Sequence, residues 1–239
     1  NKNLFIIDSK TLKPCNVNAK NDSQKFALHA LMAPSEEIPL VILKGPAGSA
    51  KTFLSLAAGV DQTYDGKYGK IVITRANVLA DKDIGYLKGS LEDKMNPLLA
   101  PFYDNLEVIL RCFNGGEKES NEQIQMQIED MKESGILEVA SLAYMRGRSL
   151  NGAFIIVDEV QNMSPLQVLT LVTRAGMGTK VVLCGDLDQI DAPNLDRENN
   201  ALAYVSEKMK NSPLCAQITF NQDECVRSPL ALEAAAKLT

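Results

Sequence analysis

The sequence predicts an α/β fold, in which a mostly parallel β-sheet is sandwiched by helices, on two observations. Short apolar runs typical of buried strands alternate with helical runs along most of the 239 residues. The apolar run 40–43 also leads directly into a glycine-rich turn, and helix-forming residues follow from position 53. Strand, glycine-rich turn and helix in this order are typical of a loop that binds phosphate.

Each expected element follows from its own pattern. A helix is expected at 22–33, where Asp22 or Ser23 can serve as the N-cap. After the strand at 40–43, further strands are expected where apolar residues run together, at 70–75, 136–140, 153–157, 180–184 and 216–220. Helical runs separate most of them, for example at 165–174 and 198–210. Because ligands of parallel sheets bind at the carboxyl ends of strands, the residues just after each strand are candidates for chemistry.

A long helical region lies between the strands at 70–75 and 136–140. Its first helix is expected to end at Asn96-Pro97, and a further helical run follows it. After a polar loop, one more helix has a single apolar face, and we interpret this helix as a surface insertion. That face consists of Ile124, Ile128 and Met131. Residues 1–20 are interpreted as an N-terminal hairpin or linker, and 21–239 as the main domain.

The composition limits the classes of function. With 45% hydrophobic and 23% charged residues, the chain can bury a sizeable core. The net charge of −5 does not favour a broad basic surface for nucleic acid, so such a contact would need a local basic strip. The five cysteines form no CxxC pair and are interpreted as reduced thiols of a cytoplasmic protein. No apolar run approaches membrane-spanning length, and a single histidine excludes multi-histidine metal sites and His-dependent triads.

The glycine-rich turn reads GPAGSAKT. Successive backbone N–H groups in such a turn converge on an anion at a helix N-terminus, where the helix dipole adds positive potential. Lys51 can reach the terminal phosphates, and Thr52 can offer its hydroxyl to Mg²⁺. The expected nucleotide-binding residues are therefore Gly45, Pro46, Ala47, Gly48, Ser49, Ala50, Lys51 and Thr52.

One position departs from the usual pattern of this loop. The residue before the lysine is normally glycine, and here it is Ala50. Alanine costs little at this point if the backbone has negative φ, and more if the loop needs positive φ. The bland alternative for the whole turn is a chance Gly/Ala-rich connection before a helix.

Two carboxylates directly follow the strand at 153–157. Asp158 can hold a water on Mg²⁺, and Glu159 can orient or deprotonate the attacking water. A strand that ends in acidic surface residues is the alternative for this pair alone. Together with the upstream loop, the pair favours a nucleotide hydrolase.

Three further residues have roles that fit such a site. Gln189, after the strand at 180–184, can bridge the γ-phosphate and the attacking water. Arg227, after the last strand, can stabilise charge on the phosphate from its own or a neighbouring subunit. Gln24, upstream of the loop, can pair with adenine through both atoms of its amide.

Basic residues after strands or in loops offer a local strip for a nucleic-acid backbone. They are Arg75, Lys82, Arg146 and Arg148. Such side chains can clamp phosphates, or contact a nucleotide in a partner subunit, and a solvated basic loop is the alternative.

At this point the set of motifs resembles the PhoH-like ATPases, which are phosphate-starvation-associated proteins related to superfamily 1 helicases. The resemblance covers the chain from about Asn21 onward. It rests on GPAGSAKT, ITRANVLADKDIGYLKGSLEDKMNPLLAPFYDNL, LAYMRGRSLNGAFIIVDEVQN, GDLDQID and the pair Arg227-Ser228.

The resemblance implies a RecA-like P-loop ATPase that uses ATP and Mg²⁺. Lys51, Glu159, Gln189 and Arg227 would be catalytic, while Thr52 and Asp158 would hold the metal. Gln24 would match the residue that recognises adenine. The resemblance also implies RNA or single-stranded DNA as partner and a homo-oligomer, with a hexameric ring as in other members of the family.

The closest branch carries an N-terminal PIN nuclease domain before the ATPase. Residues 1–20 are too few for such a domain, so nuclease activity is unsupported for this chain. Three functions stay open: an ATPase that moves along nucleic acid, a nucleotide-dependent binding switch with slow or no turnover, and a small-molecule kinase. Nothing in the sequence resembles the substrate lid or acceptor site of a kinase.

Overall fold

The computed structural model describes residues 12–76, 91–116, 119–140, 142, 149–225, 230 and 233, with the backbone alone for 91–98. The described residues form a six-stranded sheet with the strand order β3-β2-β4-β5-β1-β6, and every neighbouring pair in it is parallel. The strands are β1 (Leu40–Lys44), β2 (Lys70–Arg75), β3 (Leu137–Val139), β4 (Ala153–Asp158), β5 (Lys180–Gly185) and β6 (Cys215–Thr219).

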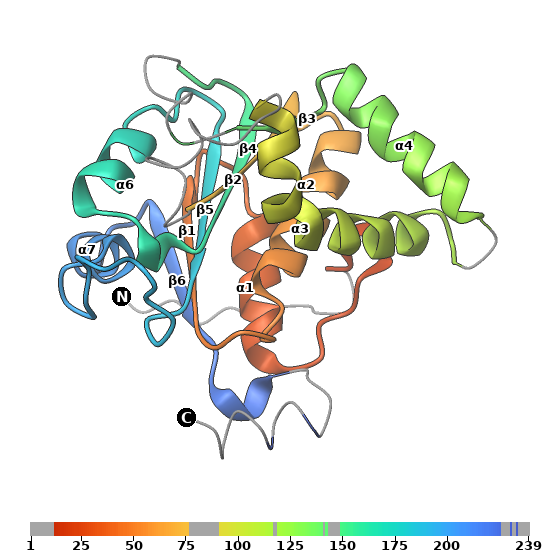
Figure 1. The fold of residues 1–239 in the computed structure, drawn as a ribbon. Coiled ribbons are helices and arrows are strands. Elements are labelled where there is room, and N and C mark those ends of the chain that lie inside the picture. Colours follow the sequence, from red (N-terminus) through yellow and green to blue (C-terminus); the bar gives the residue numbers. More distant parts are fainter. Residues whose placement is uncertain are drawn as a thin grey trace.

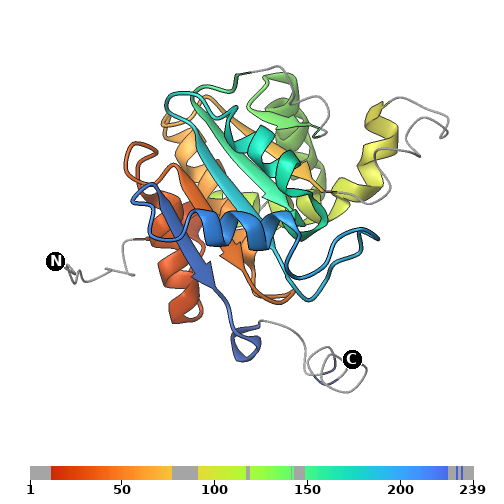
Figure 2. The ribbon, with the colours of Figure 1, turned by 90° about the vertical axis from the view of Figure 1, so that its left-hand side faces the viewer.

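Helices cover both faces of this sheet (Figure 1). One face carries α1 (Asp22–Met32), α2 (Lys51–Tyr64), α3 (Leu91–Phe113) and α4 (Asn121–Glu133). The opposite face, turned toward the viewer in Figure 2, carries α6 (Pro165–Val172) and α7 (Ala201–Lys208). Three 3-10 turns complete the described elements: η1 (Pro14–Asn16), η2 (Val160–Asn162) and η3 (Gln222–Glu224). The predicted parallel sheet between two layers of helices is therefore confirmed.

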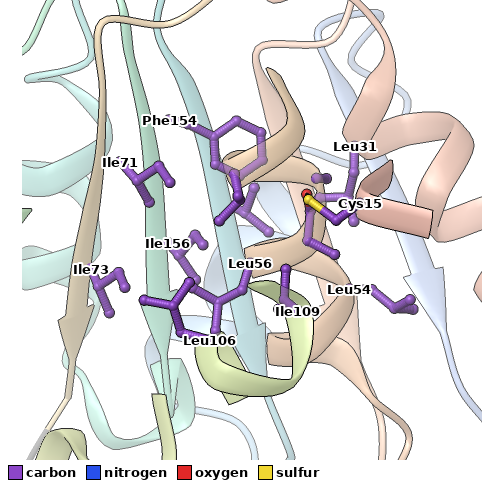
Figure 3. Packing of buried hydrophobic residues seen from close by; sticks show 14 of the residues in the cluster. Cys15, Leu31, Leu54, Leu56, Ile71, Ile73, Leu106, Ile109, Phe154 and Ile156 are labelled. Carbon is purple, nitrogen blue, oxygen red and sulfur yellow. The ribbon is translucent and has the colours of Figure 1, made fainter. Parts of the chain in front are cut away.

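Two hydrophobic clusters, one under each helical layer, hold the sheet in place. In the larger one, fully buried residues of β2 and β4 meet α2 and α3, as Figure 3 shows for Ile71, Phe154, Leu56 and Leu106. Strand residues alternate between the two clusters, because successive side chains of a strand point to opposite faces. Strands buried on both faces read as continuous apolar runs, which is why they were readable in the sequence.

The expectation that a helix ends at Asn96-Pro97 is wrong. Helix α3 continues from Leu91 to Phe113 through both Pro97 and Pro101. A proline removes one backbone donor and strains the preceding turn, but apolar packing can hold the helix through that cost. Here the buried residues of α3 form one stripe against α2, consisting of Leu99, Phe102, Leu106, Ile109 and Leu110.

Other boundaries moved by a few residues, for reasons visible in the caps. Helix α7 begins at Ala201 and not at 198, because the Asn200 side chain accepts from the N–H of Ala203. Helix α4 begins after Ser120, which forms a capping box with Gln123. The predicted apolar face of α4 is buried in the larger cluster, so this helix is part of the main core on its inner side.

The segment 12–20 also packs against the main body. Cys15 is buried in the larger cluster, where its backbone N–H donates to Asp61 Oδ1 at 2.7 Å. All five cysteines are free. No helix among the described residues combines the length and the apolarity needed to cross a bilayer.

Candidate functional site

The glycine-rich loop lies at the carboxyl end of β1, where the ends of β4 and β5 also meet. Gly45 has φ of 145°, and a Cβ there would lie 2.6 Å from the carbonyl oxygen of Phe220. Gly48 also has positive φ, at 85°. Both positions therefore require glycine for its positive φ, and Gly45 also leaves no space for a side chain. The loop is tied to the neighbouring strand because the Gly45 N–H donates to the Gly185 carbonyl at 3.2 Å.

Lys51 lies at the start of α2 with its side chain folded back over the loop. Its Nζ donates to the carbonyls of Gly45 (2.7 Å) and Pro46 (2.9 Å) and to Ser49 Oγ (3.1 Å). The residue is 8% exposed, and burial lowers the pKa of its ammonium below the ordinary value. The Lys51 ammonium thus donates to oxygens of the loop itself, with the same N–H groups that would donate to a phosphate.

Ala50 settles the conditional expectation about the loop. Its φ is 68° and its ψ is 21°, so the alanine takes the left-handed conformation that glycine adopts without strain. As the N-cap of α2, Ala50 provides no side-chain cap. No N-cap side chain therefore competes with a ligand for the first N–H groups of α2, at the helix end where an anion is most favoured.

Thr52 and Asp158 come together across the loop and β4. Thr52 Oγ1 donates to Asp158 Oδ1 at 3.0 Å, although the two residues are 106 positions apart. Burial raises the pKa of the Asp158 carboxyl, and the neighbouring charge of Glu159 raises it further. A divalent cation beside Asp158 would favour the ionised form.

This pair of oxygens fits Mg²⁺. The ion prefers hard oxygen ligands, and nucleotide sites supply one or two protein oxygens while phosphates and waters supply the rest. The described residues contain no cluster of three or more His, Cys, Asp or Glu side chains suited to a metal. Thr52 and Asp158 would therefore hold the ion only together with the phosphates of a nucleotide.

Glu159 has a strained backbone and a fixed carboxylate. Its φ of 56° is left-handed, which costs a non-glycine residue about 1–3 kcal/mol. One carboxylate oxygen, Oε1, accepts from Arg75 Nη2 at 3.0 Å, and the other, Oε2, accepts from Gln161 Nε2 at 2.6 Å. The side chain is 26% exposed, so water reaches it.

A cavity of about 260 Å³ opens between these elements. The loop, the two carboxylates and Gln189 all contribute to its walls. The residues that line it are Ala47, Gly48, Ala50, Lys51, Thr52, Phe53, Asn105, Asp158, Glu159, Gly185, Asp186 and Gln189. The structure thus brings together Lys51, Thr52, Asp158, Glu159 and Gln189, which the sequence predicted separately.

The family model described as PhoH-like protein matches residues 16–238. The chain belongs to the PhoH-like family. It is 44% identical over 220 residues to Protein PhoH2 of Bacillus subtilis, covering 92% of this chain and 47% of that protein. It is also 36% identical over 216 residues to a PhoH-like protein of Bacillus subtilis, covering 89% of this chain and 63% of the relative. The family and the loop architecture together make this PhoH-like chain a P-loop NTPase.

The chain therefore spans only 47% of the length of Protein PhoH2 and 63% of the length of the PhoH-like protein. Among solved structures, the Pif1 helicase from Candida albicans matches with a TM-score of 0.37 and 16% identity, covering 85% of this chain and 39% of the helicase. A TM-score this low supports no inference about activity or partners.

Some predicted site residues of this PhoH-like protein lie apart from the cavity. Gln24 is 2% exposed on α1 and does not line it. Its Oε1 accepts from the Lys20 N–H at 2.8 Å, whereas its Nε2 is buried with no hydrogen-bond partner in the part of the chain that the structure describes. An unpartnered buried donor is costly, so a ligand acceptor would relieve it. Arg227, Lys82, Arg146 and Arg148 lie outside the described residues.

The sequence did not predict two residues that line the cavity, nor one residue that binds Glu159 from behind it. Phe53 and Asn105 line the cavity, the latter from α3, and a single polar residue in an amphipathic helix carries no signal of that position. Gln161 binds Glu159 and was also missed, although its place two residues after the acidic pair was a usable clue.

Proposed function

We propose that residues 21–239 form an ATPase domain that binds ATP with Mg²⁺ in this cavity and hydrolyses it. The hydrolysis drives movement along RNA or single-stranded DNA in the cytoplasm, within a homo-oligomer for which a hexameric ring is the expected assembly. The family membership is consistent with an ATPase, and the five free cysteines are consistent with the cytoplasm.

One observation carries the ATPase proposal: Lys51, the Thr52–Asp158 pair and Glu159 line a single cavity. A cation for phosphate, two oxygens for a metal and a carboxylate for water are the parts that phosphoryl transfer to water requires. Because little covalent chemistry falls to the protein in this reaction, the placement of these groups supports catalysis directly.

Each residue has a defined task in the proposed reaction. The Lys51 ammonium exchanges the carbonyls of Gly45 and Pro46 for phosphate oxygens, and the first N–H groups of α2, which no N-cap side chain binds, bind the same phosphates. Thr52 and Asp158 would hold Mg²⁺, which would neutralise charge on the phosphates.

Attack on the phosphate involves the other wall of the cavity. Glu159 accepts a proton from the attacking water, and Gln189 orients that water against the terminal phosphate. Arg227 stabilises the charge that develops on the transferred group, from its own subunit or from the next one.

A second candidate function is favoured by Ala50. Its left-handed backbone strains the loop that must close on phosphate, so nucleotide could bind and order the site while turnover stays slow. In that case the domain is a nucleotide-dependent binding switch and not a motor.

Steady-state phosphate release from Mg-ATP, with and without RNA or DNA oligomers, separates the two functions. Stimulation by an oligomer supports the motor, and tight binding of Mg-ATP with no turnover supports the switch. The mass of the assembly measured with and without ATP tests the oligomer.

The variant Glu159→Gln tests the chemistry itself. We expect kcat to fall by about 10²–10⁴-fold, the usual contribution of a general base, while ATP binding measured by calorimetry is retained. Glu122→Gln on the exposed side of α4 is the matched control and should keep wild-type turnover. Wild-type turnover in Glu159→Gln would remove Glu159 from its proposed role.

A further inference from the structure

Gln161 lies in η2, directly behind the wall of the cavity, and is fully buried. Its amide makes three hydrogen bonds. Nε2 donates to Glu159 Oε2 at 2.6 Å and to the Gln189 carbonyl at 2.8 Å, and Oε1 accepts from the Asp186 N–H at 3.0 Å. Both N–H donors of the amide are therefore used, each on an acceptor from a different segment.

The partners fix which end of the amide is which. A carboxylate and a carbonyl only accept in this setting, and a backbone N–H only donates, so only the observed orientation satisfies all three. Glutamine also has the required length and charge. Asparagine is one methylene shorter, and glutamate would set an anion against the Glu159 carboxylate.

Gly185 makes room for this arrangement. A Cβ at that position would lie 2.6 Å from Gln161 Oε1 and 2.8 Å from Leu202 Cδ2. Gly185 ends β5, which pairs with both β1 and β4. The amide of Gln161 thus connects the residues that follow β4 with those that follow β5. In the sheet, β5 lies between β4 and β1, the strand that leads into the glycine-rich loop.

All three partners of Gln161 line the cavity. Glu159 and the turn 186–189 both contribute to its walls, and in the proposed reaction both face the terminal phosphate. Arg75 donates to the other oxygen of Glu159 at 3.0 Å, so the direction of the carboxylate depends on two donors, and Gln161 also binds the turn.

We propose that Gln161 is a positioning residue that locks the Glu159 carboxylate to the turn carrying Gln189, so that both sides of the phosphate site keep one geometry. This role rests on the proposed ATPase function and extends it. Without the amide, Glu159 keeps its charge and Gln189 its side chain, but the two no longer have a fixed separation.

The test compares Gln161→Met with Gln167→Met. Methionine nearly keeps the length of the side chain and removes its hydrogen bonds. Gln167 caps α6 through the Ser164 N–H at 2.7 Å and has no contact with the cavity, so its variant controls for loss of stability alone.

In Gln161→Met we expect kcat for phosphate release to fall by about 10–100-fold, as for a displacement of about 1 Å in a catalytic group. The KM for ATP should change by less than threefold, because the loop and Lys51 are untouched. Gln167→Met should keep wild-type kcat.

A second readout needs no turnover. Hydrogen exchange of the Asp186 amide should become faster in nucleotide-free Gln161→Met, and should stay at the wild-type rate in Gln167→Met. If Gln161→Met does not fold, Gln161→Asn is measured in the same way, because it keeps the amide but cannot reach all three partners.

The outcomes separate the two proposals. If the wild-type protein releases phosphate and Gln161→Met, or Gln161→Asn in its place, has the same kcat, the positioning role is wrong and the ATPase stands. If the wild-type protein neither binds nor hydrolyses Mg-ATP, the proposed function is wrong and the role of Gln161 falls with it.

Discussion

Two buried lysines stand at opposite ends of the sheet and are satisfied by backbone carbonyls. Lys51, at the carboxyl end, donates to Gly45 and Pro46, and Lys180, at the amino end of β5, donates to Ala30 (3.0 Å) and Ile38 (2.8 Å). Burial lowers the pKa of both, that of Lys180 to about 8. The two differ in what surrounds their partners.

The partners of Lys51 are neutral oxygens of a partly exposed loop beside an open cavity, from which an anionic ligand would have access to the ammonium. Those of Lys180 join the end of α1 and the connection to β1, and Lys180 itself is 0% exposed. The two lysines therefore make the same kind of hydrogen bond, but a ligand has access to replace the partners of Lys51 and has no access to those of Lys180. Access to the bonding partners therefore distinguishes the proposed phosphate-binding cation from the structural one.

The largest difference between the two lysines is expected in turnover. Lys51→Met should lower phosphate release by at least about 10²-fold, since a preorganised cation on the phosphates is removed. Lys180→Met should leave kcat and KM within about twofold of wild type, because Lys180 does not line the cavity. Equal losses of turnover in both variants, at a temperature where both are folded, would contradict the comparison.

The same two variants should differ in stability, in the opposite sense. Lys180→Met leaves the buried Ala30 carbonyl and the Ile38 carbonyl without a donor, which should lower the free energy of unfolding by about 1–3 kcal/mol. Lys51→Met should change it by less than about 1 kcal/mol, because water in the cavity can reach the freed carbonyls. Urea unfolding monitored by circular dichroism measures both.

The pH dependence of stability sharpens the assignment of Lys180. Its folded pKa is about 8 and the unfolded value is 10.5, so between these limits the unfolded chain binds a proton that the folded chain has lost. Stability relative to Lys180→Met should therefore be flat below pH 8 and rise above it, by about 2 kcal/mol from pH 8 to pH 10.

The comparison with the variant is needed because buried thiols act with the opposite sign. Burial raises the pKa of Cys15 and of Cys184 to about 12, and both thiols are present in the two proteins. Their contributions cancel in the difference. If the free energy of unfolding of wild type and that of Lys180→Met change in parallel between pH 7 and pH 10, Lys180 does not titrate in that range.

The smallest expected effect concerns the residue before Lys51. Ala50→Gly removes the cost of a left-handed alanine but adds freedom to the unfolded chain, so the free energy of unfolding should rise by only about 0.5 kcal/mol. We expect kcat to change by less than threefold. A tenfold rise in kcat would instead show that Ala50 limits turnover and would favour the nucleotide switch.

Much of the fold was readable because buried parallel strands have continuous apolar sequences. The meeting of Thr52 with Asp158 followed from one rule, that the carboxyl ends of parallel strands share an edge of the sheet. The roles of Lys51, Glu159 and Gln189 in the reaction stay predictions, and Arg227 lies outside the described residues.

What escaped prediction depends on the direction of single side chains. Gln161 turns behind the cavity because η2 follows the left-handed backbone of Glu159, and no periodic pattern encodes that turn. Asn105 lines the cavity from α3, which continues through Pro97, where a break was expected. The position of β5 between β1 and β4 is likewise a matter of topology, which apolar runs alone do not specify.

The strand order has a consequence for how this chain is made. β1 pairs with β5 and β6, so the strand that carries the phosphate loop leaves the ribosome roughly 135 residues before β5, the first of these two neighbours to be synthesised. At usual rates of translation this delay is on the order of ten seconds or more. During it, an apolar strand lacks its two permanent neighbours, and a chaperone that shields it would protect the nascent protein from aggregation.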